Sequence, residues 1–69
     1  MIEIEDHGRV RRLRLNRPPV NAFDRALLES LDAAMRQAVA DDKGAVVVCG
    51  QQGLFSAGLD IRALLPLPP

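Results

Sequence analysis

The sequence predicts a small α/β unit in which two strands, one helix and a third strand follow one another. Residues 2–15 alternate between apolar and charged side chains around a glycine, which is typical of a hairpin. Residues 25–40 repeat apolar side chains at helical spacing, and residues 45–49 form an uninterrupted apolar run. A strand, a helix of this length and a further strand form a βαβ crossover, so we expect the last two strands to be parallel.

The predicted hairpin consists of two short strands with one apolar face each. Isoleucines alternate with glutamates over residues 2–5, and Gly8 provides the backbone freedom that a tight turn needs. Val10 and Leu13 mark the second strand, but their spacing breaks the period of two. We therefore expect a bulge or a strong twist near Arg11.

Arginines crowd the second strand and the residues beside it. They are Arg9, Arg11, Arg12, Arg14 and Arg17. Because alternate side chains of a strand point to opposite sides, we expect these arginines to lie on a solvated face. A nucleic-acid-binding patch is the alternative, but the chain has no Tyr or Trp on which bases would stack, and its nine basic residues are balanced by nine acidic ones. We expect no nucleic-acid partner.

A proline-containing link leads from the hairpin to the helix. Pro18 and Pro19 favour an extended, stiff backbone over residues 16–19. Asp24 is expected to cap the helix, because its carboxylate can accept hydrogen bonds from the first turn. The apolar residues of the helix form one stripe, in which Met35 is expected to fill the core. The members of this stripe are Leu27, Leu28, Leu31, Ala34, Met35, Ala38 and Val39.

The third strand is expected to be buried on both faces, because residues 45–49 carry no charged side chain. Cys49 ends this run and is most simply a small buried hydrophobe, without a visible cation beside it to activate the thiol. Residues 60–65 have helical potential, and Pro66 ends that segment.

The size of the chain limits what it can do alone. At 69 residues, a single hydrophobic core is marginally stable, which leaves a very small single domain, an oligomer or a piece of a larger fold, and we favour the last. One cysteine excludes an internal disulfide, and one histidine leaves no cluster with metal-ligand spacing. The acidic start is unlike a secretory signal, and no apolar run approaches the length of a membrane span. We expect a cytoplasmic protein with no metal site and no membrane partner.

Most side-chain chemistry can be set aside on spacing. Ser56 lacks the Gly-x-Ser-x-Gly context of a nucleophile, and His7 is distant from it in the sequence. Gly50, Gly53 and Gly58 do not have the spacing of a dinucleotide-binding fingerprint. No lysine follows Gly58, as a phosphate-binding Walker loop would require.

The main chain of the loop over residues 50–60 is the remaining candidate. Small side chains at residues 56–58 would let a ligand approach the backbone, and the N–H groups that follow Gly58 would converge on an oxyanion or a phosphate. Asp60 is expected to cap the next helix or to interact with its dipole rather than to react. A well-packed strand-to-helix turn without any ligand explains this spacing equally well.

Several motifs occur together in a characteristic order. They are Asn-Arg-Pro at residues 16–18, Asn-Ala-Phe-Asp at 21–24, the leucines of 27–31, the strand over 46–50 and Phe-Ser-Ala-Gly-Leu-Asp-Ile at 55–61. In this combination they resemble the crotonase superfamily, the enoyl-CoA hydratases and isomerases, over residues 2–65. The last motif also resembles the Δ3,Δ2-enoyl-CoA isomerases.

The resemblance implies a crotonase-like (ClpP/crotonase) α/β spiral, of which this chain supplies an incomplete N-terminal ββαβ portion. It implies an acyl-CoA thioester as the substrate, coenzyme A as part of that substrate without a separate cofactor, and homo-oligomers that are trimers or hexamers. In the family, two backbone N–H groups polarise the thioester carbonyl and stabilise an enolate, and the first of them corresponds to Leu59. The residues expected to contact the substrate or CoA are Ala22, Ser56, Ala57, Gly58, Asp60 and Ile61.

The chain departs from the family where catalysis would be completed. The family's second N–H donor and catalytic glutamates lie beyond the segment that resembles this chain, and Glu3, Glu5 and Glu29 do not match their positions. Two interpretations follow: the N-terminal part of an acyl-CoA enzyme, or a non-catalytic fragment that associates with itself or with a full-length homologue. Because a missing acid or base costs roughly 10²–10⁴-fold in rate, we expect no measurable hydration of crotonyl-CoA by the 69-residue chain.

Overall fold

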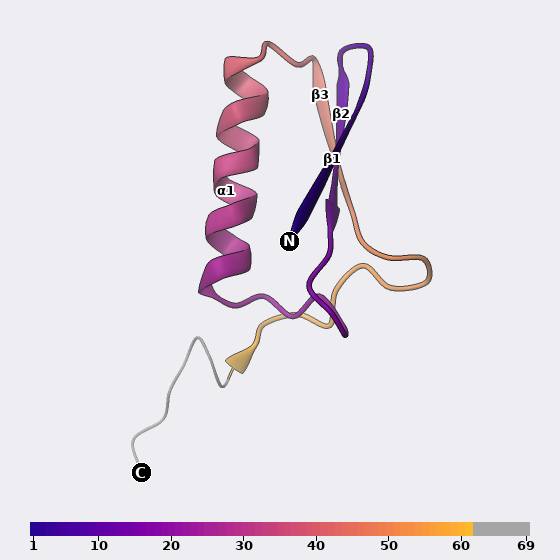
Figure 1. The fold of residues 1–69 in the computed structure, drawn as a ribbon, viewed down its shortest axis with the longest axis vertical. Helices are drawn as coiled ribbons and strands as arrows, with labels where there is room; N and C mark the ends of the chain where they lie inside the picture. Colours follow the sequence, from indigo (N-terminus) through magenta and orange to yellow (C-terminus); the bar gives the residue numbers. More distant parts are fainter. Residues whose placement is uncertain (62–69) are drawn as a thin grey trace.

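The computed structural model describes residues 1–61, which form one sheet with a helix against it (Figure 1). The elements are β1 (Ile2–His7), β2 (Val10–Leu15), α1 (Arg25–Ala40) and β3 (Ala45–Cys49). The strand order is β1-β2-β3, with β1 antiparallel to β2 and β3 parallel to β2. The predicted ββαβ fold, including its parallel crossover, is therefore confirmed.

The hairpin is regular along its whole length. The pairing runs without interruption from Ile2 opposite Leu15 to His7 opposite Val10, so the bulge predicted near Arg11 is wrong. Gly8 takes a φ of 60°, which lets the chain reverse tightly enough for every pair to form. The apparent break in period arises because Arg11 occupies a position on the apolar face of β2, in line with Leu13 and Leu15.

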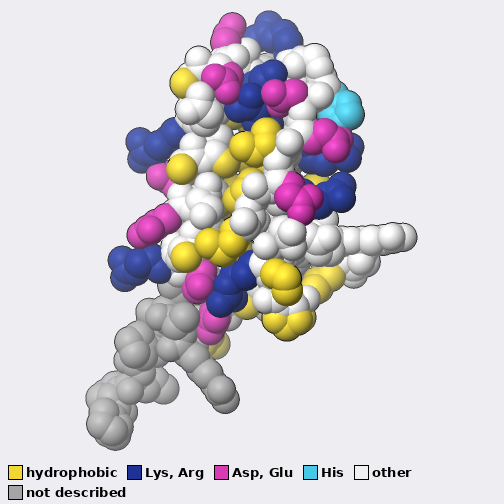
Figure 2. All heavy atoms as spheres, viewed as in Figure 1, with side chains coloured by type: hydrophobic (Ala, Val, Ile, Leu, Met, Phe, Trp, Pro, Cys, Tyr) yellow, Lys and Arg dark blue, Asp and Glu magenta, His cyan; other side chains and the backbone are white. Residues whose placement is uncertain are grey.

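The core lies between α1 and one face of the sheet, where Figure 2 shows hydrophobic side chains along the boundary. Its fully enclosed members are Leu13 and Leu15 of β2 and Leu27 of α1, joined by Ala34 and Ala38. The small side chains of Ala34 and Ala38, in the C-terminal half of the helix, let it approach the strands closely. The N-terminus of the helix is closed by the Oδ1 atom of Asp24, which accepts a hydrogen bond of 2.8 Å from the Leu27 N–H, as predicted.

The apolar stripe of α1 is wider than the surface it covers. Leu27, Ala34 and Ala38 lie against the sheet, whereas Leu28, Met35 and Val39 on the flank are exposed. Met35 is 41% exposed, so the prediction that it fills the core is wrong. The reason is geometric: within residues 1–61, the sheet has three strands and reaches only the centre of the stripe.

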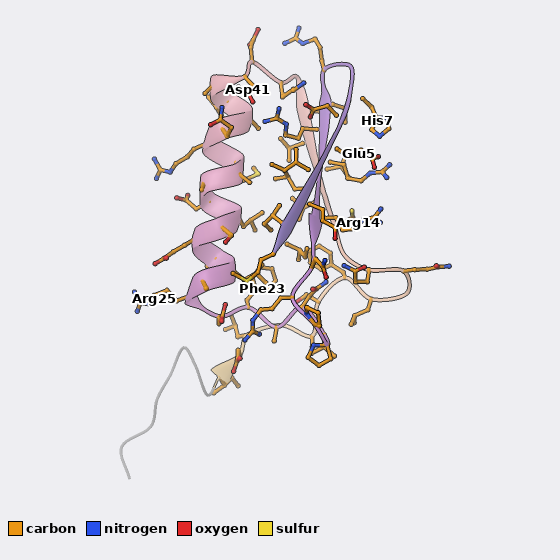
Figure 3. All side chains as sticks on the ribbon, in the orientation of Figure 1. Glu5, His7, Arg14, Phe23, Arg25 and Asp41 are labelled. Carbon is orange, nitrogen blue, oxygen red and sulfur yellow. The ribbon has the colours of Figure 1, made fainter. Side chains whose placement is uncertain are left out.

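β3 is an edge strand of the described sheet, and its Val46 and Val48 are partly buried on the face that they share with Arg11 and Leu13 of β2. Val47 on its other face is exposed, so the prediction of burial on both faces is wrong for residues 1–61. The side chains of Glu5, His7 and Arg14 also project from the face away from α1 (Figure 3). Cys49 is only partly buried, and a hydrogen bond to its side chain raises the pKa of Arg14, so a cation does lie beside the thiol.

Arg11 contradicts the prediction of a wholly solvated arginine face. Its side chain is 8% exposed and lies among the charged groups at the turn end of the hairpin. Its Nε and Nη2 donate to the two carboxylate oxygens of Asp6 at 2.7 and 3.0 Å, and its Nη1 donates to Asp41 Oδ2 at 2.7 Å. Arg11 thus ties β1 to the residue that ends α1. The alternation that buries Leu13 also buries Arg11, and the two carboxylates make that burial possible.

The pKa of Asp6 leads to a prediction about acid stability. Hydrogen bonding to Arg11, followed by that to Lys43, lowers the pKa of this carboxyl from 3.8 to about 2. A group whose pKa is depressed in the folded state stabilises that state above its unfolded pKa and loses this effect as pH falls through the folded value. We expect the midpoint temperature of thermal unfolding to decrease as the pH is lowered from about 4 to about 2.

Thermal unfolding followed by circular dichroism across this pH range tests the prediction. Asp6→Asn should make the midpoint fall less steeply, because the variant has no carboxyl to protonate at this position. Asp42→Asn is the matched control, since the Asp42 side chain is 96% exposed and lies 3.9 Å from its nearest cation, Arg9. An unchanged acid dependence in Asp6→Asn would contradict the assignment to Asp6.

Candidate functional site

Residues 50–60 return beneath the sheet and run beside the link that precedes α1 (Figure 1). The two segments are joined by main-chain hydrogen bonds. Ala57 N–H donates to Val20 O at 2.9 Å, and Phe23 N–H donates to Gly58 O at 2.8 Å. Phe23 and Leu59 form a parallel bridge. The loop predicted as the site is therefore bound along one side to residues 20–23.

The orientation of the Leu59 N–H follows from this pairing. The Gly58–Leu59 peptide is trans and planar, so its carbonyl and its N–H point in opposite directions. Because the Gly58 carbonyl points at Phe23 N, the Leu59 N–H points away from residues 20–23. No hydrogen bond among residues 1–61 uses it, and Leu59 is 61% exposed. Within residues 1–61, this main-chain donor therefore lies on an exposed residue and has no hydrogen-bond partner.

The neighbouring N–H groups are already engaged. Gly58 N–H donates to Ser56 Oγ at 2.9 Å, and Asp60 N–H donates to Phe23 O at 2.8 Å. The expectation that several N–H groups after Gly58 converge on one point is therefore wrong. Successive N–H groups of a paired strand point to opposite sides, so of the three N–H groups of residues 58–60 only that of Leu59 has no hydrogen bond within residues 1–61. Gly58 permits this path through its φ of 95°.

Ser56 has a structural hydroxyl. Its Oγ donates to the Asn21 carbonyl at 2.7 Å and accepts from Gly58 N–H. His7 belongs to β1 and contacts Glu5 near the hairpin turn, where Figure 3 shows both side chains. The structure thus does not bring the two together as a nucleophile and its base, in line with the spacing argument.

Asp60 and the link are connected by Arg17. Its Nη2 lies 3.3 Å from Asp60 Oδ2 and 3.2 Å from Asp24 Oδ2, and its Nη1 donates to the Ala22 carbonyl at 2.8 Å. The guanidinium therefore holds the capping residue of α1 and the end of the glycine turn together. These contacts give Asp60 a structural part through Arg17, and the helix that it is expected to cap lies outside the described residues.

The remaining predicted contact residues lie around the same turn. Ala22 is partly buried in the link, Ala57 and Gly58 are exposed in the loop, and Ile61 is exposed at its end. Pairing of the link with the loop brings Ala22 beside the turn although the two are far apart in sequence. Their part in binding substrate stays a prediction.

Sequence reasoning missed two residues that organise this region. The sequence pattern predicts Arg17 on a solvated face and identifies Asn21 only as part of a motif. Asn21 is buried at a φ of 52°, and it closes residues 17–21 into a turn by donating its N–H to Arg17 O at 2.8 Å. The expected extended link is thus wrong. A polar Asn between a proline turn and a helix cap was the available signal, since Asn tolerates positive φ.

The described part of the chain holds neither a metal-binding cluster nor a membrane-spanning helix. Over residues 1–61, no three His, Cys, Asp or Glu side chains gather closely enough to hold a metal ion. Over the same residues, no helix combines the length and apolar character needed to cross a lipid bilayer.

The fold and the turn together define a class of protein. It is a ββαβ unit that presents one main-chain N–H donor on a glycine turn beyond the carboxyl end of a parallel strand. Comparison with known families makes this specific. The family model described as enoyl-CoA hydratase/isomerase matches residues 5–67, and the chain belongs to this family. The resemblance to the crotonase superfamily is confirmed.

Individual relatives agree with this assignment. The chain is 44% identical over 57 residues to the human peroxisomal bifunctional enzyme, a match that covers 81% of this chain and 8% of that protein. It is 41% identical over 63 residues to a protein of Rhizobium meliloti named as a probable enoyl-CoA hydratase. This match covers 88% of this chain and 24% of that protein. The chain therefore spans about a quarter or less of the length of these relatives.

Solved structures show the same fold. A probable enoyl-CoA hydratase from Mycobacterium tuberculosis superposes with a TM-score of 0.82 at 30% identity. DspI from Pseudomonas aeruginosa superposes with a TM-score of 0.78 at 36% identity. Each match covers 88% of this chain and 26% of the solved one. The chain has the architecture of the corresponding part of these proteins.

Proposed function

We propose that this chain binds an acyl-CoA thioester and stabilises negative charge on the thioester oxygen with the Leu59 N–H. One observation supports this most directly: the Leu59 N–H is unbonded within residues 1–61 while the groups on either side of it are held. Membership of the enoyl-CoA hydratase/isomerase family supplies the chemical class of the substrate.

The proposed chemistry depends on the donor being fixed before the substrate arrives. Hydrogen bonds from Phe23 N–H to Gly58 O and from Asp60 N–H to Phe23 O hold the peptide on both sides of Leu59. A donor held in this way needs no reorganisation when charge develops on a carbonyl oxygen. Loss of one such donor costs on the order of 10²–10³ in rate. An enolate formed beside the thioester carbonyl would receive this stabilisation.

The substrate contacts proposed around this donor are small or apolar. Ala57 and Gly58 leave the main chain accessible, and Ile61 offers an exposed apolar surface to the pantetheine arm. The full proposed set is Ala22, Ser56, Ala57, Gly58, Asp60 and Ile61. Coenzyme A enters as part of the substrate, and the proposal includes no separate cofactor.

The acid/base chemistry lies outside this proposal. Glu3 accepts a hydrogen bond from Asn16, Glu5 pairs with Arg12 at 3.3 Å, and Glu29 is exposed on α1. None has a contact that connects it to the Leu59 N–H. A homo-oligomer, trimeric or hexameric, and a cytoplasmic location remain parts of the proposal, the second resting on the single cysteine.

Association without catalysis is the second candidate. β3 pairs with β2 along one edge, and Val47 is exposed on the face away from α1. An edge strand with an exposed apolar residue is a site at which another chain can pair. This chain would then act by associating with a second copy or with a longer homologue.

Titration of the 69-residue chain with crotonyl-CoA separates these candidates. We expect calorimetry to show binding, and absorbance at the enoyl band to show no measurable hydration. Gly58→Val should weaken binding by about tenfold or more, because valine is strained at a φ of 95° and would turn the Leu59 N–H away.

Gly53→Val is the matched control for that variant. Gly53 also has a positive φ, of 80°, and an added Cβ would meet nothing within 4 Å at either glycine. Equal loss of binding in both variants would assign the effect to backbone strain rather than to the Leu59 N–H. Absence of binding by the parent chain would favour association, and efficient turnover would contradict the expected lack of an acid/base group.

A further inference from the structure

Asn21 is a polar residue enclosed in the link between β2 and α1. Its residue surface is 2% exposed, yet each of its side-chain polar atoms has a partner. Oδ1 accepts from Arg17 N–H at 2.7 Å, and Nδ2 donates to Leu15 O at 3.1 Å and to Phe55 O at 3.0 Å. A buried amide is costly unless it is satisfied in this way. One side chain therefore joins the end of β2, the link and the loop that carries the glycine turn.

A second connection runs from the Asn21 main chain to the turn. The Asn21 carbonyl accepts from Ser56 Oγ at 2.7 Å, and the same Oγ accepts from Gly58 N–H at 2.9 Å. The residue before Asn21 contributes as well, since Val20 O accepts from Ala57 N–H at 2.9 Å. The contacts of Asn21 thus lead, one residue after another, to the peptide that carries the Leu59 N–H.

We propose that Asn21 is a positioning residue that sets the direction of the Leu59 N–H. The direction of that N–H is fixed by the Gly58–Leu59 peptide plane. Asn21 holds the loop on the near side of this peptide through Phe55 and Ser56. An Asn suits the position because it tolerates a φ of 52° and offers a donor and an acceptor at once. The inference rests on the proposed function of the turn.

Amide hydrogen exchange on the ¹⁵N-labelled 69-residue chain tests this positioning without any ligand. Asn21→Gly keeps the positive φ and removes the side-chain hydrogen bonds. We expect exchange at Ala57, Gly58 and Asp60 to accelerate by about tenfold, while the amides of α1 keep their rates. Asn16→Gly is the matched control, because the Asn16 side chain also donates a hydrogen bond, to Glu3 at 2.6 Å, but does not contact the turn.

Ser56→Ala is the second variant, and it cuts the connection while leaving the Asn21 side chain in place. We expect it to accelerate exchange at Gly58 and Ala57. If Asn21→Gly accelerates exchange equally in α1 and in the turn, the variant has lost the fold. The exchange rates of Ser56→Ala then decide whether the connection to Asn21 holds the turn. Unchanged exchange at the turn in Ser56→Ala, or in a folded Asn21→Gly, would overturn the positioning role.

A crotonyl-CoA titration of the same samples distinguishes this inference from the function on which it rests. In the parent chain we expect the ligand to shift the Leu59 amide resonance, and in Asn21→Gly we expect a shift at least several-fold smaller at equal ligand concentration. Absence of a shift in the parent would contradict the proposed function, whereas the exchange rates would still report whether Asn21 holds the turn.

Discussion

Gly50→Ala is expected to displace the loop over residues 51–60 and to abolish detectable acyl-CoA binding. An added Cβ at Gly50 would lie closer than 3.0 Å to the carbonyl oxygens of Leu54 and Phe55 and to the Phe55 Cα. These are backbone atoms, so rotation of a side chain cannot relieve the overlap. Overpacking of this kind typically costs about 1–3 kcal/mol and forces the backbone to shift.

The displacement would reach the candidate site through Asn21. Phe55 O, one of the overlapping atoms, accepts the 3.0 Å hydrogen bond from Asn21 Nδ2. Movement of this carbonyl would break the bond and leave a buried amide donor unsatisfied, which adds its own cost of about 1–3 kcal/mol. The glycine turn would lose its attachment to the link, and with it the fixed direction of the Leu59 N–H.

Two measurements check the Gly50→Ala prediction. Amide chemical shifts should change over residues 51–60 and remain close to those of the parent in α1, and calorimetry with crotonyl-CoA should show no binding. Gly44→Ala is the matched control: its Cβ would approach only the Arg9 side chain, at 3.4 Å, which can move aside. A Gly50→Ala chain that binds as the parent does would show that the loop conformation is unimportant for the proposed site.

The elements of this fold could be predicted from the sequence because each depends on local spacing. The helical period of residues 25–40, the alternation before residue 15 and the apolar run of 45–49 each specify one element. The Asp24 cap is equally local, since its carboxylate bonds an N–H three residues away. For the same reason the crossover between parallel strands followed directly from the order of the elements.

The burial of individual side chains could not be predicted in the same way, because it depends on which elements pack against them in the folded chain. Met35 and Val47 belong to apolar patterns but remain 41% and 48% exposed within residues 1–61. Arg11 is buried because Asp6 and Asp41, distant in sequence, supply its hydrogen bonds. The charge of Arg11 therefore predicts a solvated position, whereas its place on the buried face depends on carboxylates that only the folded chain brings there.

The candidate site shows the same division. The glycine turn was visible as a run of small residues after a strand, so its location could be predicted. The direction of the Leu59 N–H could not, because it depends on pairing with Phe23 across the molecule. The structural part of Asn21 could not be predicted for the same reason, since it depends on hydrogen bonds to Leu15 and Phe55 that only the folded chain brings together.

Leu27→Ala is expected to destabilise the fold more than any other truncation on the helix. The Leu27 side chain is 0% exposed and lies in the first turn of α1, against the sheet. Removal of a buried leucine costs about 2–5 kcal/mol. A single core in a chain of this size rarely supplies more than about 3–5 kcal/mol in total. We therefore expect Leu27→Ala to be largely unfolded, with no cooperative urea transition by circular dichroism.

Leu28→Ala makes the same chemical change one residue later and is the matched control. Because Leu28 is 42% exposed, its truncation should cost well under half as much and leave a cooperative transition. Equal losses of stability in the two variants would contradict the assignment of Leu27, but not Leu28, to the core. They would mean that Leu28, Met35 and Val39, exposed in the single chain, are covered in solution by a second copy. The midpoint of such a sample would then rise with protein concentration, which a monomeric fold does not show.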